Sequence, residues 1–388
     1  MAIAPSSARS QIAGLYVHIP FCKTKCTYCD FNCYAGQNHL IPSYVEALCR
    51  ELETYAEAGR QASTLYFGGG TPSLLAPEQV SRIVETARTA LGLPSGSDVE
   101  VTLEANPGSV DEAYFRAILH AGVNRVSIGI QSFFEEDLRR LARRHTVQEA
   151  REAFEAARSA GVGSISLDLI YGLPDQTLAA WEHNLTEALR LGPDHVSLYA
   201  LQIEEGTPLA RQVARGVVRP LEDDLTADMY ERAQEMLSAG GLERYEISSW
   251  GRPGLRSQHN LIYWRNEQYI GAGAGAHGSL SGVRYSNERL PARYIGRASR
   301  GEPTVVEQER IAPEMERAES AILGLRLEEG LRDADFRARY GVGLDELYGP
   351  AFDDAVGQGL LARRDGAVVL TDRGKLLSNE VFVRLLPD

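Results

Sequence analysis

The sequence lacks three things: a long apolar run, cysteines spread along the chain, and an excess of basic residues. No stretch approaches the roughly 18 consecutive apolar residues of a membrane-spanning helix, and the opening MAIAPSSARSQIAG has no apolar core of a signal peptide. More than 300 residues after Cys49 contain no cysteine, unlike a secreted disulfide scaffold. These absences predict a cytoplasmic protein with no direct membrane insertion and a short flexible lead over residues 1–13.

The formal net charge is −13 over 388 residues, and no basic stripe stands out. Nucleic-acid binding depends mainly on Lys and Arg contacts to phosphate, so this charge balance predicts no nucleic-acid partner. The last segment, residues 310–388, is itself acidic, with eleven Lys or Arg against fifteen Asp or Glu.

Short β-rich segments alternate with amphipathic helical segments from residue 14 to residue 205. Several helical segments end in Gly, the residue preferred just past a helix C-terminus. This alternation predicts a parallel sheet with right-handed crossovers. Six units are too many for a small domain, so we expect an α/β fold: a whole or partial (β/α)6 TIM-like barrel over 14–205. The six strands are expected at 14–20, 64–69, 98–107, 125–132, 164–172 and 195–204.

The alternation stops after residue 205. Residues 206–311 are loop-rich and aromatic and are expected to complete the barrel. Residues 312–388 contain three helical stretches and then a Gly-broken β pair, which predicts a small winged-helix-like domain. Winged helices often bind DNA, but an acidic module is a poor phosphate binder. We interpret this domain as a cap or partner-docking module over the barrel mouth.

Four of the five cysteines lie in CKTKCTYCDFNC, residues 22–33. Zinc sites usually combine two C-x2-C pairs far apart in sequence, and no second pair follows here. Three cysteines on one tight loop can instead supply three thiolates to an iron–sulfur cubane and leave its fourth iron open. An iron–sulfur site is favoured over zinc or a metal-free thiol group.

Polar and glycine-rich residues fall where the predicted strands end, which is where barrel folds build their sites. Glycines in GGGTPS let backbone N–H groups approach a ligand closely, although the segment also fits a tight turn before a helix. Acids within apolar strands are costly unless they are paired or bind a ligand. The alternative is a structural ion-pair network across the barrel mouth. The residues concerned are Gly69, Gly70, Thr71, Glu104, Gln131, Arg143 and Asp168.

Taken together, YVHIPFCKTKCTYCDF, GGGTPS, TLEANPG, GIQSF and DLIYGLPDQT resemble the radical S-adenosylmethionine (SAM) proteins of the oxygen-independent coproporphyrinogen III oxidase family. The resemblance covers about residues 14–385. It implies that Cys22, Cys26 and Cys29 hold a [4Fe–4S] cluster and that SAM chelates the open iron. It also matches the residues above, with Tyr16 and Tyr28, to positions that contact SAM; Arg144 is the alternative to Arg143.

The stretch HNLIYW, residues 259–264, resembles the HNxxYW motif that marks the haem-chaperone branch of this family. Taken alone, it also fits an aromatic patch that closes the lower side of the barrel. The branch implies haem as a carried ligand, delivered to apo-haemoproteins such as respiratory-chain components, and a homodimer is a further expectation. Histidine can ligate haem iron and aromatic rings can pack on a porphyrin. The candidate haem residues are therefore His259, Asn260, Tyr263 and Trp264.

Two features separate this branch from the true oxidases. The oxidases carry a fourth cysteine two residues after the third, where this chain has Phe31, and they have a longer N-terminal extension. Both features favour the chaperone over the oxidase, which remains the alternative. Cys33 has no counterpart in the pattern. We expect it to be a bystander on the far side of the loop, or a spare thiol that captures metal when the cluster is lost.

Overall fold

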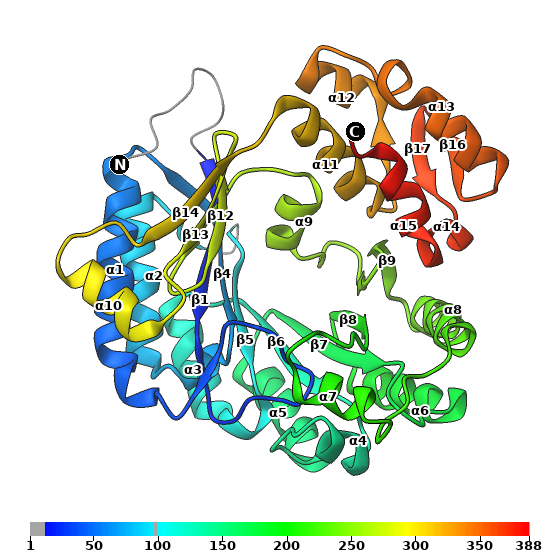
Figure 1. Cartoon of the computed structure of the whole chain (residues 1–388). Helices are drawn as coiled ribbons and strands as arrows, with labels where there is room; N and C mark the ends of the chain where they lie inside the picture. The colour runs from blue at the N-terminus through cyan, green and yellow to red at the C-terminus, as the bar shows by residue number, and fades with distance from the viewer. Residues whose placement is uncertain (1–11, 97–98, 388) are drawn as a thin grey trace.

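Six parallel strands form the centre of the computed structural model, which describes residues 12–96 and 99–387 (Figure 1). Each strand pairs with the next in chain order. The six predicted strands are therefore confirmed. The lead predicted for 1–13 falls outside the described residues up to residue 11, and Ile12 and Ala13 already belong to the first strand. The strands are β1 (Ile12–Ile19), β4 (Gln61–Gly69), β5 (Val101–Ala105), β6 (Arg125–Gln131), β7 (Ser164–Tyr171) and β8 (His195–Ala200).

Helices connect these strands and cover the outer face of the sheet (Figure 1). Local sequence sets their ends. Thr146 and Glu149 form a reciprocal capping box at the start of one helix, which ends at Gly161 in the left-handed conformation. Asp111 caps another by accepting from the backbone N–H of Tyr114. The helices are α1 (Ile41–Glu57), α2 (Pro77–Leu91), α3 (Glu112–Ala121), α4 (Glu135–Arg140), α5 (Val147–Ala160) and α6 (Leu178–Leu191).

The sheet continues on both sides of the six strands. Next to β1 lie β11 (Tyr269–Ala272), β12 (His277–Leu280), β13 (Val283–Asn287) and β14 (Val305–Arg310). Next to β8 lie β10 (Ser249–Gly251) and β9 (Glu243–Glu246). In the part of the chain that the structure describes, β14 and β9 are the two edges, so the sheet is an open, partial barrel. The remaining helices of this region are α7 (Pro208–Ala214), α8 (Asp223–Ala239), α9 (Gln258–Trp264) and α10 (Pro291–Ser299).

Alternation along the strands separates an apolar outer face from a more polar interior. In β1, Leu15, Val17 and Ile19 have no exposed surface and belong to the main apolar core. The residues between them, Tyr16 and His18, point to the other face, because successive side chains of a strand point to opposite faces. The interior of the barrel therefore carries the groups that can bind and react.

The C-terminal domain has its own apolar core, beside α9 and β9 (Figure 1). The backbone N–H of Ile247 donates to the Arg326 carbonyl at 3.1 Å, and that of Glu328 donates to the Tyr245 carbonyl at 3.0 Å. The helix–strand–helix–helix–hairpin order, with sheet order β15-β17-β16, agrees with the predicted winged-helix-like module. The elements are α11 (Pro313–Leu325), β15 (Leu331–Arg332), α12 (Asp333–Tyr340), α13 (Leu344–Gly357), β16 (Leu361–Arg364), β17 (Ala367–Leu370), α14 (Asp372–Leu376) and α15 (Ser378–Phe382).

The position of this domain corrects the sequence-based interpretation. Helix α9, against which α11 packs, lies beside Gly14 and Thr64, in the amino-terminal halves of β1 and β4. The prediction that the domain covers the barrel mouth, at the carboxyl ends of the strands, is therefore wrong. Within the described ranges, no helix is both long enough and apolar enough to span a bilayer.

Candidate functional site

The cysteine loop leaves the carboxyl end of β1 and closes on itself. Its stem is formed by β2 (Phe21–Cys22) and β3 (Tyr34–Ala35), which pair in parallel. The loop is tied to the segment that follows α4 by Thr27, whose backbone N–H donates to the Leu141 carbonyl at 3.2 Å. The loop is thus held at both its stem and its outer part.

All four thiols of the loop line one cavity of about 380 Å³. Cys22 and Cys33 are buried, Cys26 and Cys29 are half-buried, and none forms a disulfide. The Sγ atoms of Cys29 and Cys33 lie 3.9 Å apart. The hydrogen bond from Cys33 lowers the pKa of the Cys22 thiol to about 7, which favours the thiolate that a metal requires. The expectation that Cys33 lies on the far side of the loop is wrong.

The GGGTPS segment forms the next wall of this cavity, at the carboxyl end of β4. Gly69 has a φ of +111°, which favours glycine. A Cβ on Gly70 would lie 2.6 Å from the Phe21 carbonyl oxygen and 3.1 Å from Cys22 Sγ. The Thr71 hydroxyl donates to Cys22 Sγ at 3.5 Å. These glycines therefore bring the backbone close to the cysteine loop as well as forming a turn.

Two half-buried acids face the same cavity from β5 and β7, the strands on either side of β6. Glu104 accepts from the Tyr66 hydroxyl at 2.9 Å, and Asp168 accepts from the Ser127 hydroxyl at 2.9 Å. Burial and the charge of Asp168 raise the pKa of Glu104 to about 7, and burial raises that of Asp168 to about 6. Neither makes an ion pair among the described residues, so the structural ion-pair alternative is not supported. Tyr66 and Ser127 were not identified as site residues from the sequence. The signal that could have identified them is their position on the inward face of apolar strands.

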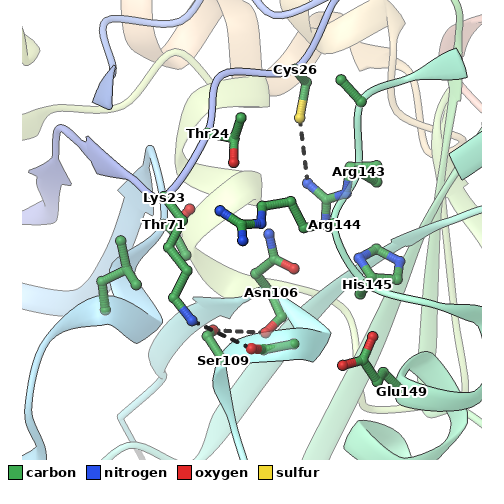
Figure 2. Close-up of a pocket in the computed structure, with 13 residues that line it drawn as sticks. Lys23, Thr24, Cys26, Thr71, Asn106, Ser109, Arg143, Arg144, His145 and Glu149 are labelled. Atoms are coloured by element: carbon green, nitrogen blue, oxygen red, sulfur yellow. Dashed lines mark hydrogen bonds between the residues drawn. The ribbon is translucent and has the colours of Figure 1, made fainter. Parts of the chain in front are cut away.

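Gln131 and Arg143 complete the cavity wall. Gln131 has a φ of +70° at a register shift in β6, a strained conformation of the kind found at functional sites. Arg143 donates to the Gly129 carbonyl at 2.5 Å and contacts Cys26 Sγ at 3.9 Å, while its Nε is buried without a partner in the structure. Figure 2 shows Arg143 reaching Cys26, whereas Arg144 points into a neighbouring pocket of about 200 Å³. Arg143, rather than Arg144, lines the main cavity.

The two predicted tyrosines take different positions. Tyr28 lines the cavity and packs against the apolar cluster of Leu141, Ile170 and Leu173. Tyr16 lies deeper in the barrel: its hydroxyl is 3.0 Å from His18 Nδ1 and its ring stacks on that of Tyr66. Tyr16 is therefore outside the lining of the cavity, and its predicted contact with a cofactor stays a prediction.

The HNLIYW stretch forms α9, which plugs the amino-terminal end of the barrel. His259 has no exposed surface; its Nδ1 is 2.7 Å from the Thr64 hydroxyl and its Nε2 is 2.8 Å from the Tyr263 hydroxyl. Its ring stacks on Tyr66 with centroids 5.1 Å apart, and burial lowers its pKa to about 3. Both ring nitrogens are thus engaged inside the barrel in this conformation.

The other face of α9 contacts the C-terminal domain. The Trp264 ring lies 4.4 Å from the guanidinium of Arg326, and its indole nitrogen is buried without a partner in the structure. Asn260 is half-buried near the helix start, where its backbone N–H donates to the capping Ser257 hydroxyl at 3.4 Å. The four predicted haem residues therefore share one helix, away from the cysteine cavity.

Comparison with known proteins identifies the families that this chain resembles. Residues 16–188 match the radical SAM superfamily, and residues 311–377 match the HemN C-terminal domain. The haem chaperone HemW of Bacillus subtilis (strain 168) is 39% identical over 375 residues, covering 95% of this chain and 97% of the relative. HemW of Escherichia coli (strain K12) is 38% identical over 383 residues, covering 97% and 98%.

The chain belongs to the HemW family. The resemblance drawn from its motifs is therefore confirmed. A solved structure of E. coli coproporphyrinogen III oxidase (HemN), described as a radical SAM enzyme, has a TM-score of 0.82, covering 97% of this chain and 91% of that chain. At 22% identity this match shows a shared fold. The fold alone does not separate the HemW family from HemN.

Proposed function

We propose that this protein is a haem chaperone built on a radical SAM core. The observation that carries the proposal is the near full-length similarity to HemW relatives, in a chain with an intact HNLIYW motif. Phe31 supports it: this exposed side chain lines the cysteine cavity at the position where the oxidases have a fourth cysteine. In this function the protein binds haem and delivers it to acceptor haemoproteins.

The cavity residues fit a [4Fe–4S] cluster with SAM. Soft thiolates are the ligands that iron–sulfur clusters require, and we assign Cys22, Cys26 and Cys29 to this role. Gly69, Gly70 and Thr71 line the cavity beside Cys22, where their backbone groups and the Thr71 hydroxyl can contact the methionyl group, while the unpartnered Nε of Arg143 offers a buried donor. Glu104 and Asp168 are acceptors for hydroxyl groups. Bound together, the cluster and SAM supply one-electron cleavage of a carbon–sulfur bond; the chain's residues hold and orient them.

The alternative function is oxygen-independent coproporphyrinogen III oxidation. Two assays on one anaerobically reconstituted sample distinguish the functions. The first supplies coproporphyrinogen III with SAM and a reductant, and we expect no protoporphyrinogen IX. The second titrates haem and follows the Soret band, and we expect binding at about one haem per chain. Formation of protoporphyrinogen IX in the first assay would contradict the chaperone proposal.

We propose His259 as the haem ligand. Its imidazole is buried in this conformation, so the proposal makes a specific demand on α9. Ligation requires α9 to move, because both ring nitrogens are hydrogen-bonded inside the barrel. We expect His259→Ala to weaken haem binding at least tenfold, measured by Soret titration. Tyr263→Phe is the matched control: it frees Nε2 but keeps the imidazole, so haem binding should be retained or strengthened. Circular dichroism checks that both variants are folded, and equal haem affinity in both would remove His259 as the ligand.

The pKa of Glu104 predicts a pH-dependent affinity for SAM. At pH 8 Glu104 is mostly ionised and accepts a hydroxyl hydrogen bond; at pH 6 it is mostly protonated, since its pKa is about 7. We expect the Kd for SAM to rise about tenfold from pH 8 to pH 6, measured by calorimetry on the reconstituted protein. Glu104→Gln should bind more weakly at pH 8 and lose most of this pH dependence. An unchanged pH profile in the variant would exclude Glu104 from the SAM contact.

A further inference from the structure

Cys33 belongs to the cysteine cavity but is not one of its three assigned ligands. Its side chain is 6% exposed, and its Sγ lies 3.9 Å from Cys29 Sγ, within hydrogen-bond distance for sulfur. It lines the same cavity as Cys22, Cys26 and Cys29. The oxidase pattern has its extra cysteine at the position of Phe31, so nothing in that pattern accounts for a thiol here.

The residues on both sides of Cys33 fix its position. The Asn32 amide donates at 3.0 Å to the carbonyl oxygens of Ala274 and Arg289, and the Asn32 carbonyl contacts His18 Nε2 at 2.9 Å. Tyr34 donates its backbone N–H to the Pro20 carbonyl at 2.8 Å. The Cys33 thiol is therefore held beside Cys29 by bonds to the barrel.

The contact indicates hydrogen bonding rather than metal ligation. Thiolates bound to different irons of one cubane are kept apart by the irons between them, so a thiol in contact with one ligand sulfur is that ligand's neighbour. Cys33 also hydrogen-bonds Cys22, and a thiol carries only one S–H. Once Cys22 and Cys29 are thiolates they can only accept, so Cys33 must donate its S–H to one of them, and Cys29 is the partner at 3.9 Å. Hydrogen bonds to the sulfurs of a cluster are among the factors that set its reduction potential.

We propose that Cys33 is a positioning and tuning residue that donates an S–H···S hydrogen bond to the Cys29 ligand and raises the reduction potential of the cluster. The bond favours the reduced cluster, because reduction adds negative charge to the sulfurs. The inference rests on the cluster assigned under the proposed function. Because Cys33 acts as a hydrogen-bond donor and not as a ligand, the fourth iron stays open for SAM.

The test is a redox titration of the full chain after anaerobic reconstitution, followed by electron paramagnetic resonance. Cys33→Ala is expected to lower the reduced-to-oxidised ratio at a fixed potential about threefold to tenfold, a shift of about 28 to 59 mV to more negative potential for one electron. Cys33→Ser keeps a donor and should recover part of the shift. Cys49→Ala, which removes a buried thiol from α1, is the control and should match the wild type.

Iron analysis of the same samples separates the outcomes. Full iron content in Cys33→Ala and Cys33→Ser, together with the negative shift in Cys33→Ala, supports the inference. A potential equal to that of Cys49→Ala would overturn it, and so would an iron loss as large as that of Cys26→Ser, which would make Cys33 a ligand. Absence of a cluster in the wild type would overturn the proposed function as well.

Discussion

Cys26→Ser is expected to leave the reconstituted protein with almost no bound cluster. Cys26 is the central cysteine of the three, and Arg143 lies 3.9 Å from its sulfur. Cys33 contacts Cys29, and we assign it as a hydrogen-bond donor and not as a replacement ligand. A serine oxygen is a much poorer ligand for iron than a thiolate. We expect iron to fall from about four per chain to a small fraction of one.

The measurement is iron and sulfide analysis with the visible absorption of the cluster, on protein reconstituted without oxygen. Cys49→Ser is the control, because Cys49 is buried in α1 outside the cavity and its loss should leave the iron content unchanged. Retention of more than half of the iron in Cys26→Ser would show that the ligand assignment is wrong. Circular dichroism distinguishes cluster loss from unfolding.

Glu51→Ala is expected to destabilise the barrel by about 3 to 5 kcal/mol. Glu51 is a buried carboxylate of α1 with four donors: the Tyr294 hydroxyl, the Thr304 hydroxyl, the Asn287 amide and the backbone N–H of Gly273. Truncation removes the acceptor that all four share; the Asn287 amide keeps the Gly273 carbonyl at 3.0 Å, and the other three donors are left buried without their acceptor. The Gly273 bond also fixes the turn that holds the cysteine loop through Asn32.

Urea unfolding, followed by the fluorescence of the buried Trp181 and Trp250, measures this change. Glu53→Ala is the matched control, because Glu53 is exposed on the same helix, and it should change the free energy of unfolding by less than about 0.5 kcal/mol. If the free energies of unfolding of Glu51→Ala and Glu53→Ala differ by less than about 1 kcal/mol, the four hydrogen bonds of Glu51 do not stabilise this region.

Much of the cavity could be predicted from sequence because parallel strands bring their carboxyl ends to one edge. Glu104 and Asp168 stood out as acids within apolar strands, and the structure places both at the cavity. Their hydrogen-bond partners Tyr66 and Ser127 did not stand out, since Tyr and Ser are common in strands and only the pairing of strands shows which face they share.

Three features of the structure depend on contacts between separate segments of the chain, which the spacing of motifs in the sequence does not encode. Parallel pairing of β2 with β3 returns the chain to the start of the loop, and Cys33, next to β3, lies 3.9 Å from Cys29. The HNLIYW stretch is a short helix whose buried face is set by Thr64, far away in the sequence. The C-terminal domain was expected over the barrel mouth, but the bond between Ile247 and Arg326 belongs to an interface at the other end.

The cysteine loop lies at the carboxyl ends of the barrel strands, whereas α9 lies beside their amino-terminal halves (Figure 1). An electron-transfer protein that docks over the loop would cover one end of the molecule. A haem acceptor that docks beside α9 would cover the other. The two partners would then form a ternary complex instead of competing for one surface, and an electron could enter the cluster while an acceptor is already bound.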